Sequence, residues 1–174
     1  TEKQPDGQVL CGQVHDPLAR ILNGGISGNA GVFSCAEDIA ILCAALQNGG
    51  EWNGHRILSP QGVKTMRTVP RATADLGRSP GWDVCSPYAS NAGDFFGPNT
   101  YGHTGYTGTS VVIDPDNDTS VILLTNAVHP EDGHSVVRLR SLVANAVAAS
   151  LYPAPRTYTD HYYKRFLQFM DEPA

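Results

Sequence analysis

The residues best suited to chemistry in this 174-residue chain form a polar triplet, His103-Thr104-Gly105, followed at once by Tyr106-Thr107-Gly108-Thr109. A polar triplet that leads into a buried strand can form one wall of a serine-hydrolase cleft. Serine enzymes with a late Lys-Thr-Gly triplet also carry a Ser-x-x-Lys nucleophile. Here histidine replaces the lysine, and no serine of the chain has a lysine three residues later. We therefore expect the C-terminal part of an enzyme whose nucleophile lies upstream.

Composition and charge restrict the classes of function. The chain is 41% hydrophobic and 17% charged, and its 18 glycines and 12 prolines predict many turns and a mixed α/β or α+β build. A net charge of -5 argues against a nucleic-acid surface, which needs a basic stripe. The longest apolar run, residues 39–46, is far shorter than the roughly 20 residues of a membrane span. We expect no nucleic-acid partner and no membrane span in this chain.

Two helices are predicted ahead of the triplet. Ser34-Cys35-Ala36-Glu37 has the pattern of a capping box, in which the serine hydroxyl and the glutamate carboxylate each accept a backbone N–H. Apolar residues then recur at helical spacing until Asn48-Gly49-Gly50, so we expect a helix over residues 35–47. Ser59-Pro60 begins a second, shorter helix, because proline suits the first helical position.

The region around the triplet predicts a β-sheet. Residues 106–113 and 119–126 are rich in β-formers and flank the turn residues 114–118, which indicates an antiparallel hairpin. Residues 121–124 are apolar at consecutive positions, as expected for a strand that helices cover on both faces. Three further segments are expected earlier in the chain: a loop at 70–80, a short strand at 81–84 and a long loop that ends at Pro98.

Residues 135–151 predict the last helix of the domain. Its expected apolar stripe consists of Val136, Leu139, Leu142, Val143, Ala146 and Val147. Together the elements predict an α/β (α+β) fold, with an antiparallel sheet backed by helices, over residues 1–152. Residues 153–174 are expected to form a C-terminal extension or a linker.

Other polar clusters have simpler explanations than a cofactor site. Asp114, Asp116 and Asp118 alternate as at the start of a calcium loop, but the sixth and twelfth positions of that loop are both threonine. His129 and His134 are five positions apart with a proline between them, so one helical face does not present both. We expect neither a metal nor a cofactor, and we interpret the aspartates as part of a hairpin turn.

Two further features are expected to be structural. Cys35 and Cys43 would lie about 12 Å apart on one helix, too far for a disulfide, and are interpreted as small buried apolar residues. His15-Asp16 imitates a catalytic dyad, but neighbours in sequence rarely point at one substrate. A structural hydrogen bond is the expected role of that pair.

Four stretches carry a resemblance to a known family when taken in this order. They are Val14-His15-Asp16-Pro17, then Gly28-Asn29-Ala30-Gly31-Val32-Phe33-Ser34 with Glu37-Asp38, then Asn48-Gly49-Gly50-Glu51-Trp52 with Ile57-Leu58-Ser59-Pro60, and Gly102-His103-Thr104-Gly105-Tyr106-Thr107-Gly108-Thr109. From about residue 12 to 150, the chain resembles the C-terminal half of the serine β-lactamase and penicillin-binding-protein-like family. The branch that it resembles contains class C β-lactamases, D-Ala-D-Ala carboxypeptidases and esterases.

The resemblance implies a two-lobed fold and a role for each residue of the triplet. The catalytic serine would open a helix between the lobes, upstream of this chain. His103 would replace the usual lysine, Thr104 would hydrogen-bond a substrate carboxylate or carbonyl, and Gly105 would keep the strand clear for substrate. Tyr106 would supply half of the oxyanion hole through its backbone N–H. Because histidine, with an ordinary pKa of about 6.5, is mostly neutral at pH 7, the departure from lysine favours a peptidase or esterase over a dedicated β-lactamase.

The implied function is that of a serine hydrolase that forms an acyl-enzyme on an ester, an amide, a β-lactam or a D-Ala peptide. The expected partners are a small-molecule or peptide substrate and the missing N-terminal lobe of the same protein. The chain alone is expected to be inactive, and the family resemblance favours a periplasmic or extracellular location. A non-catalytic module of the same fold that binds a cell-wall peptide or another ligand is the alternative. A purely structural domain is a third interpretation.

Overall fold

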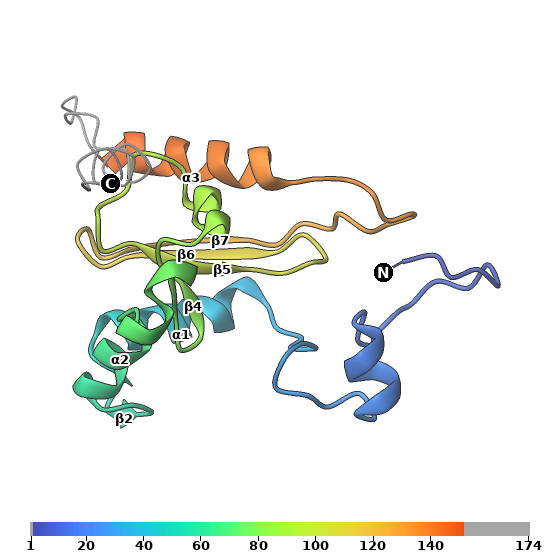
Figure 1. The fold of residues 1–174 in the computed structure, drawn as a ribbon, viewed down its shortest axis with the longest axis horizontal. Coiled ribbons are helices and arrows are strands. Elements are labelled where there is room, and N and C mark those ends of the chain that lie inside the picture. Colours follow the sequence, from blue (N-terminus) through green and yellow to red (C-terminus); the bar gives the residue numbers. More distant parts are fainter. Residues whose placement is uncertain (1, 152–174) are drawn as a thin grey trace, which may run out of the picture.

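The computed structural model describes residues 2–151, so the extension expected at 153–174 lies outside the described residues. A five-stranded antiparallel sheet occupies the middle of the fold, with helix α1 (Ala36–Gln47) on one face and helix α3 (Val137–Leu151) on the other (Figure 1). In spatial order the strands are β3 (Arg78–Ser79), β4 (Trp82–Asp83), β5 (Tyr101–Thr104), β6 (Ser110–Asp114) and β7 (Thr119–Leu123). The expected antiparallel sheet backed by helices is confirmed.

The two faces of the sheet pack against different helices because side chains alternate along a strand. On the α1 face, Tyr101 and Ile113 join Cys43, Leu46 and Val63 in one apolar cluster. The smaller cluster on the α3 face consists of Phe96, Val112, Ala144 and Ala148. In β7, Ile122 packs on the α1 side and Val121 on the α3 side, as expected for a strand covered on both faces.

Helix α1 begins and ends close to the predicted positions, but its first residues are held differently. Cys35 is the N-cap and makes no side-chain capping bond, so the capping box predicted for Ser34 is wrong. The Glu37 carboxylate interacts instead with its own backbone N–H and the Cys35 side chain, and these contacts lower the pKa of Glu37. At the other end, the N–H of Gly50 bonds the Ala45 carbonyl at 2.7 Å, which closes the helix in a Schellman motif.

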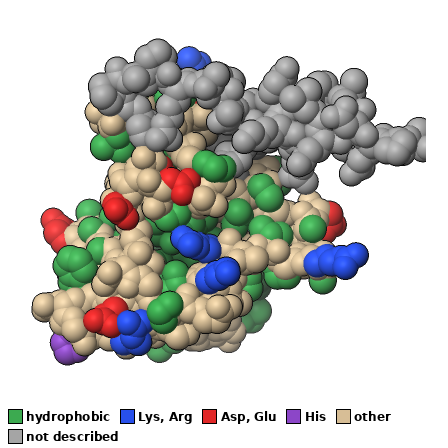
Figure 2. Space-filling model, turned by 90° about the vertical axis from the view of Figure 1, so that its left-hand side faces the viewer, with side chains coloured by type: hydrophobic (Ala, Val, Ile, Leu, Met, Phe, Trp, Pro, Cys, Tyr) green, Lys and Arg blue, Asp and Glu red, His purple; other side chains and the backbone are tan. Residues whose placement is uncertain are grey.

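Helix α2 (Pro60–Met66) begins as predicted, because the Ser59 side chain accepts the Gly62 N–H at 3.0 Å and proline occupies the first turn. A two-stranded hairpin of β1 (Glu51–Trp52) and β2 (His55–Arg56) joins α1 to α2. Figure 2 shows this end of the molecule, where hydrophobic side chains reach the surface among polar ones.

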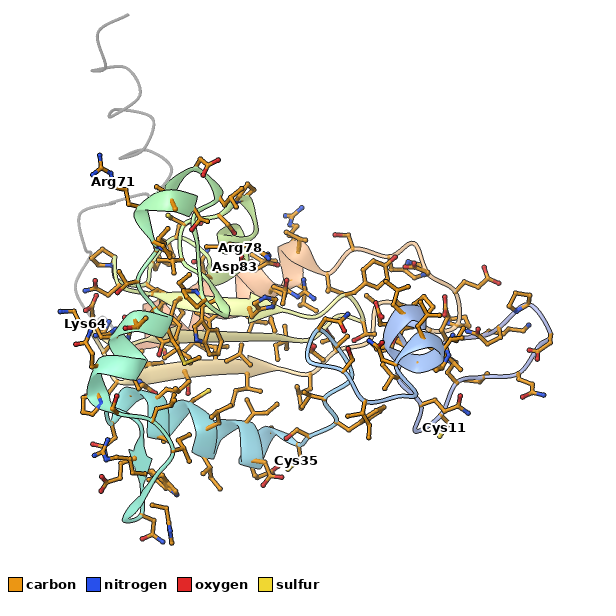
Figure 3. The ribbon with its side chains drawn as sticks, turned by 60° about the horizontal axis from the view of Figure 1, so that its bottom comes forward. Cys11, Cys35, Lys64, Arg71, Arg78 and Asp83 are labelled. Atoms are coloured by element: carbon orange, nitrogen blue, oxygen red, sulfur yellow. The ribbon has the colours of Figure 1, made fainter. Side chains whose placement is uncertain are left out.

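The prediction of a loop at 70–80 is wrong, because this segment contains regular structure. It forms a 3-10 helical segment, η2 (Arg71–Leu76), and the short strand β3, which pairs with β4. Arg78 and Asp83 face each other across this hairpin (Figure 3), with the Nε of Arg78 2.7 Å from an Asp83 carboxylate oxygen. Residues 78–79 adopt a strand conformation because their backbone pairs with β4 across a short turn. Their polar sequence alone does not predict a strand.

The loop expected to end at Pro98 also contains a helical segment, η3 (Pro87–Ala92), which lies beside α3 and β5. Farther on, the hairpin of β6 and β7 is confirmed, with Asp114 opposite Thr119. The buried Asp114 carboxylate accepts the Asp116 N–H at 3.0 Å, and Asp116 accepts the Asn99 side-chain amide at 2.8 Å. These aspartates therefore organise the turn by hydrogen bonding.

Helix α3 presents a face to the sheet that overlaps the predicted one only in part: Val147 of the predicted stripe packs against the cluster on this side of the sheet. Its buried residues are Arg140, Ala144 and Ala148, whereas Leu139 and Leu142 of the predicted stripe are exposed. Alanines four positions apart let the helix axis approach the sheet closely, and the long Arg140 side chain fills the space at the helix start. Hydrophobicity alone predicted the larger leucines inside.

Residues 2–33 form an irregular segment with one short helical stretch, η1 (Leu18–Leu22). Several of their large apolar side chains lie on the surface, with Ile26 89% and Val32 91% exposed. Cys43 is buried as predicted, but Cys35 is exposed, so only one of the two is a small core residue. All four cysteines are free thiols, and Figure 3 shows Cys11 and Cys35 on separate stretches of the chain.

Candidate active site

The predicted triplet begins on β5 and continues into the turn that follows it. His103 lies opposite Val111 of β6 and Thr104 opposite Ser110. Because side chains alternate, His103 shares the α1 face of the sheet with Tyr101, and its ring is exposed. The Nδ1 of His103 lies 3.0 Å from the Thr104 carbonyl oxygen, which the Nδ1–H tautomer donates to.

Strand β5 presents an open backbone edge at the triplet. Its pairing with β6 runs through all four residues, from Tyr101 to Thr104. On the other side, β4 pairs with β5 at Gly102 alone, opposite Asp83. Among the described residues 2–151, no strand therefore continues along the β4 side of His103 and Thr104. Backbone groups at such an edge can pair with an extended peptide.

Residues 105–109 form a tight turn between β5 and β6, so the strand predicted over 106–113 begins only at Ser110. The Gly105 N–H bonds the Thr109 carbonyl at 2.8 Å, and the Gly108 N–H bonds the Gly105 carbonyl at 3.0 Å. Gly108 has a φ of 122°, a conformation that L side chains rarely adopt. Gly108 lies inside this turn, and its backbone conformation is not that of a strand. Strand β6 therefore starts after the turn, although residues 106–109 include β-forming residues.

The Tyr106 amide is the group of interest in the turn. Within the described part of the chain, no acceptor takes a hydrogen bond from its N–H. The Tyr106 side chain is 73% exposed and points to two groups from other segments. Its hydroxyl donates to an Asp132 carboxylate oxygen at 2.5 Å, and its ring stacks on His15 at a centroid distance of 5.6 Å.

The Tyr106–Asp132 pair changes the protonation of both groups. The hydrogen bond and the negative charge of Asp132 raise the pKa of Tyr106, and the charge of Glu2 acts in the same direction. The hydrogen bond from Tyr106 in turn lowers the pKa of Asp132, helped by the Gly133 N–H and by His15. This contact ties the end of β5 to the loop before α3.

His15 and Asp16 do not form a dyad. The Asp16 carboxylate accepts the N–H of Ala19, in the first turn of η1, at 2.7 Å. His15 has its stacking contact with Tyr106, and its Nε2 lies 3.2 Å from a Glu2 carboxylate oxygen in a geometry that makes no hydrogen bond. The two residues thus have separate structural contacts, and no hydrogen bond joins them.

Arg140 lies near the triplet and was not predicted from the sequence as a residue of this site. From the buried face of α3, its guanidinium donates to three backbone carbonyls of the turn: Gly105 at 2.8 Å, Thr109 at 3.0 Å and Gly108 at 3.3 Å. The available signal was an arginine that precedes Ala144 and Ala148 at four-residue spacing. Small residues at four-residue spacing indicate a helix face that can pack closely on a sheet, and the arginine at the start of this row is then also buried.

No group of three or more histidine, cysteine, aspartate or glutamate side chains gathers into a metal-binding arrangement within residues 2–151. In the same range, no helix is both long and apolar enough to cross a membrane. What the site offers is a strand edge, a backbone N–H free of acceptors within that range and the polar side chains of His103 and Thr104.

Comparison with known proteins gives a consistent result. A family model described as Beta-lactamase matches residues 1–145. A protein of Escherichia coli (strain K12) named "Putative D-alanyl-D-alanine carboxypeptidase" is 40% identical over 123 residues, which cover 70% of this chain and 28% of that protein. A protein of Salmonella agona (strain SL483) with the same name is 37% identical over 148 residues, 83% of this chain and 33% of that protein. The chain spans about a third or less of these relatives.

Proposed function

Because this chain belongs to the serine β-lactamase and penicillin-binding-protein-like family, we propose that it is the C-terminal part of a serine hydrolase that works through an acyl-enzyme. The serine would lie in a Ser-x-x-Lys motif upstream of this chain. The substrate would be an ester, an amide, a β-lactam or a D-Ala peptide. The names of the relatives favour a D-alanyl peptide among these.

The observation that carries the proposal is the open edge of β5 beside the Tyr106 N–H. Acyl transfer places negative charge on a carbonyl oxygen, and one aimed backbone donor lowers its barrier by roughly 3–4 kcal/mol. The Tyr106 N–H has no acceptor among residues 2–151, so it is available for that oxygen. The edge at His103 and Thr104 can hold an extended substrate next to it.

Each residue then has a distinct part in the proposed reaction. Thr104 hydrogen-bonds the substrate carboxylate or carbonyl, and His103 lines the same edge in place of a lysine. Gly105 starts the turn that carries the Tyr106 donor, and the second oxyanion donor comes from the upstream serine. The missing N-terminal lobe also covers the apolar side chains that residues 18–33 expose here.

The test is acylation of the full-length protein that contains this chain. A penicillin-type or fluorophosphonate probe is expected to label one serine, located by mass spectrometry in a Ser-x-x-Lys motif. A variant with alanine at that serine serves as the control and takes up no label. The chain of 174 residues alone is expected to hydrolyse a simple ester no faster than its His103→Ala variant.

Two outcomes would contradict the proposal. A folded full-length protein that takes up no label at any serine would rule out the acyl-enzyme. Binding of wall peptides by that protein without turnover would instead favour the alternative, a non-catalytic binding module of the same fold.

A further inference from the structure

Arg140 is a buried cation whose hydrogen bonds within residues 2–151 go to uncharged groups. The residue is 7% exposed, and burial lowers the pKa of its guanidinium. No carboxylate among residues 2–151 forms an ion pair with it. A charge removed from water without a counter-charge is unfavourable unless hydrogen bonds satisfy it. An apolar side chain would fill this space at a lower desolvation cost. We therefore look for the role of Arg140 in the groups that its guanidinium binds.

Those partners lie in the turn that follows the triplet. Arg140 Nη2 donates to the Gly105 carbonyl at 2.8 Å and to the Thr109 carbonyl at 3.0 Å. Its Nε donates to the Gly108 carbonyl at 3.3 Å, and its Nη1 lies 3.3 Å from the Asn91 side-chain oxygen. One planar guanidinium therefore holds the carbonyls at both ends of the turn.

The Gly105 carbonyl belongs to the same peptide group as the Tyr106 N–H. A trans peptide group is planar, and its C=O and N–H point in opposite directions. Since the Gly105 oxygen is held toward α3 by Arg140, the Tyr106 N–H points away from α3. The Gly108 N–H, at 3.0 Å from the same oxygen, supports this orientation. Donors on a carbonyl also polarise its peptide group and strengthen the N–H as a donor.

We propose that Arg140 is a positioning residue for the hydrolase reaction: it aims and polarises the Tyr106 N–H through the Gly105–Tyr106 peptide group. The inference rests on the proposed function, in which that N–H stabilises the oxyanion. Arg140 touches no substrate, and it acts on the reaction through one peptide bond.

The first test needs no catalysis. In the isotope-labelled chain, Arg140→Met is expected to move the Tyr106 amide proton upfield and to slow its base-catalysed exchange with solvent, because the guanidinium no longer polarises the Gly105 carbonyl. Arg140→Lys keeps a cation whose N–H donors lie on a single nitrogen, so it should restore part of both changes. Arg138→Met is the matched control on the same helix, because Arg138 is exposed, and it should leave the Tyr106 amide unchanged.

An unchanged Tyr106 amide in a folded Arg140→Met chain overturns the proposal. If both Arg140 variants fail to fold, the proposal is tested on the unsubstituted chain instead. A scalar coupling across the hydrogen bond from Arg140 Nη2 to the Gly105 carbonyl carbon is then expected, and its absence overturns the proposal.

The second test measures hydrolysis by the full-length protein. Arg140→Met is expected to lower kcat by about ten- to a hundredfold, less than the roughly 10²–10³ for the loss of an oxyanion donor, with KM nearly constant. Arg140→Lys should recover part of kcat, and Arg138→Met should match the unsubstituted protein. If that protein hydrolyses nothing, the proposed function fails, while the amide measurement still decides the role of Arg140. A normal kcat in the Arg140→Met protein would overturn the proposed role of Arg140 and leave the proposed function intact.

Discussion

At the residue scale, His103 is expected to affect how the proposed site binds a charged substrate. It lies on an exposed strand edge, where a lysine would present a permanent cation. A cation at such an exposed position is worth about 0.2–1 kcal/mol to a partner carboxylate, which corresponds to at most about a fivefold change in affinity.

In the full-length protein, His103→Lys is therefore expected to lower KM about two- to fivefold for substrates with a free carboxylate at pH 7 and above. The KM of a neutral ester is the internal control and should stay the same. Steady-state kinetics with matched charged and neutral substrates measures the difference. An equal effect on both substrates would contradict an electrostatic role of position 103.

Tyr106 provides a second prediction, from its contact with Asp132. Because the Asp132 carboxylate accepts the phenol proton and repels the phenolate, the pKa of Tyr106 is raised above its ordinary value of about 10. The contribution of this contact to stability is thus complete below about pH 10 and is lost as pH rises through the raised pKa. On the acid side, the lowered pKa of Asp132 keeps the contact intact until the pH falls below its ordinary carboxyl range.

Alkaline absorbance titration of the chain, with its Tyr106→Phe variant subtracted, measures the Tyr106 phenol alone. Its midpoint is expected above pH 10, and Asp132→Asn is expected to bring it back toward that value because the negative charge is gone. A midpoint that Asp132→Asn leaves unchanged would show that the contact is absent in solution.

At the scale of elements, the turn between β5 and β6 depends on Gly108. Its φ of 122° is strained for any L side chain, and a Cβ there would lie 2.8 Å from both Ala127 N and Thr125 O. Gly133 has a similar φ of 127° but open space around the position of a Cβ. Substitution of Gly133 therefore measures the effect of backbone strain alone, whereas substitution of Gly108 adds the effect of crowding.

Both Gly108→Ala and Gly133→Ala are expected to lower the free energy of unfolding by about 1–3 kcal/mol from backbone strain. Gly108→Ala should lower it further, because a clash with backbone atoms forces the turn to shift. Denaturant unfolding of the two variants measures the difference. Equal losses would mean that the turn adapts to the added methyl group without cost.

At the scale of the whole molecule, the described chain leaves much apolar surface uncovered. Leu22, Ile26, Val32 and Phe33 of the first segment are all exposed, and so are Ile41 and Leu42 of α1. Soluble proteins rarely expose such patches unless another surface covers them. Since the chain spans only 28% to 33% of the relatives compared, a further lobe of the same protein is the proposed cover.

The chain alone is accordingly expected to bind an apolar fluorescent dye strongly, and the full-length protein to bind much less. Replacing Ile26 and Val32 by serine should reduce dye binding by the chain and change its stability by no more than about 0.5 kcal/mol per site. Dye fluorescence at equal protein concentrations provides the comparison. Strong dye binding by the full-length protein would mean that this surface stays open.

Local patterns in the amino-acid sequence were sufficient to predict several elements. Schellman glycines end α1, Ser59-Pro60 begins α2, and alternating β-formers around a polar turn form the β6–β7 hairpin. That the triplet belongs to a strand of the sheet also followed from the sequence, through the resemblance. The signals for α1, α2 and the hairpin each depend on residues within a few positions of one another, whereas the resemblance depends on the order of four separate stretches.

Tertiary structure decided what depends on distant partners. The polar segment 78–79 became a strand because β4 pairs with it, and the strand predicted from Tyr106 was interrupted by a turn that Arg140 holds from 35 residues away. The buried face of α3 followed the closeness of the sheet rather than side-chain hydrophobicity, so alanines and an arginine are inside while leucines are outside. Hydrophobic periodicity cannot show such contacts, because the partner of a buried polar group lies elsewhere in the sequence.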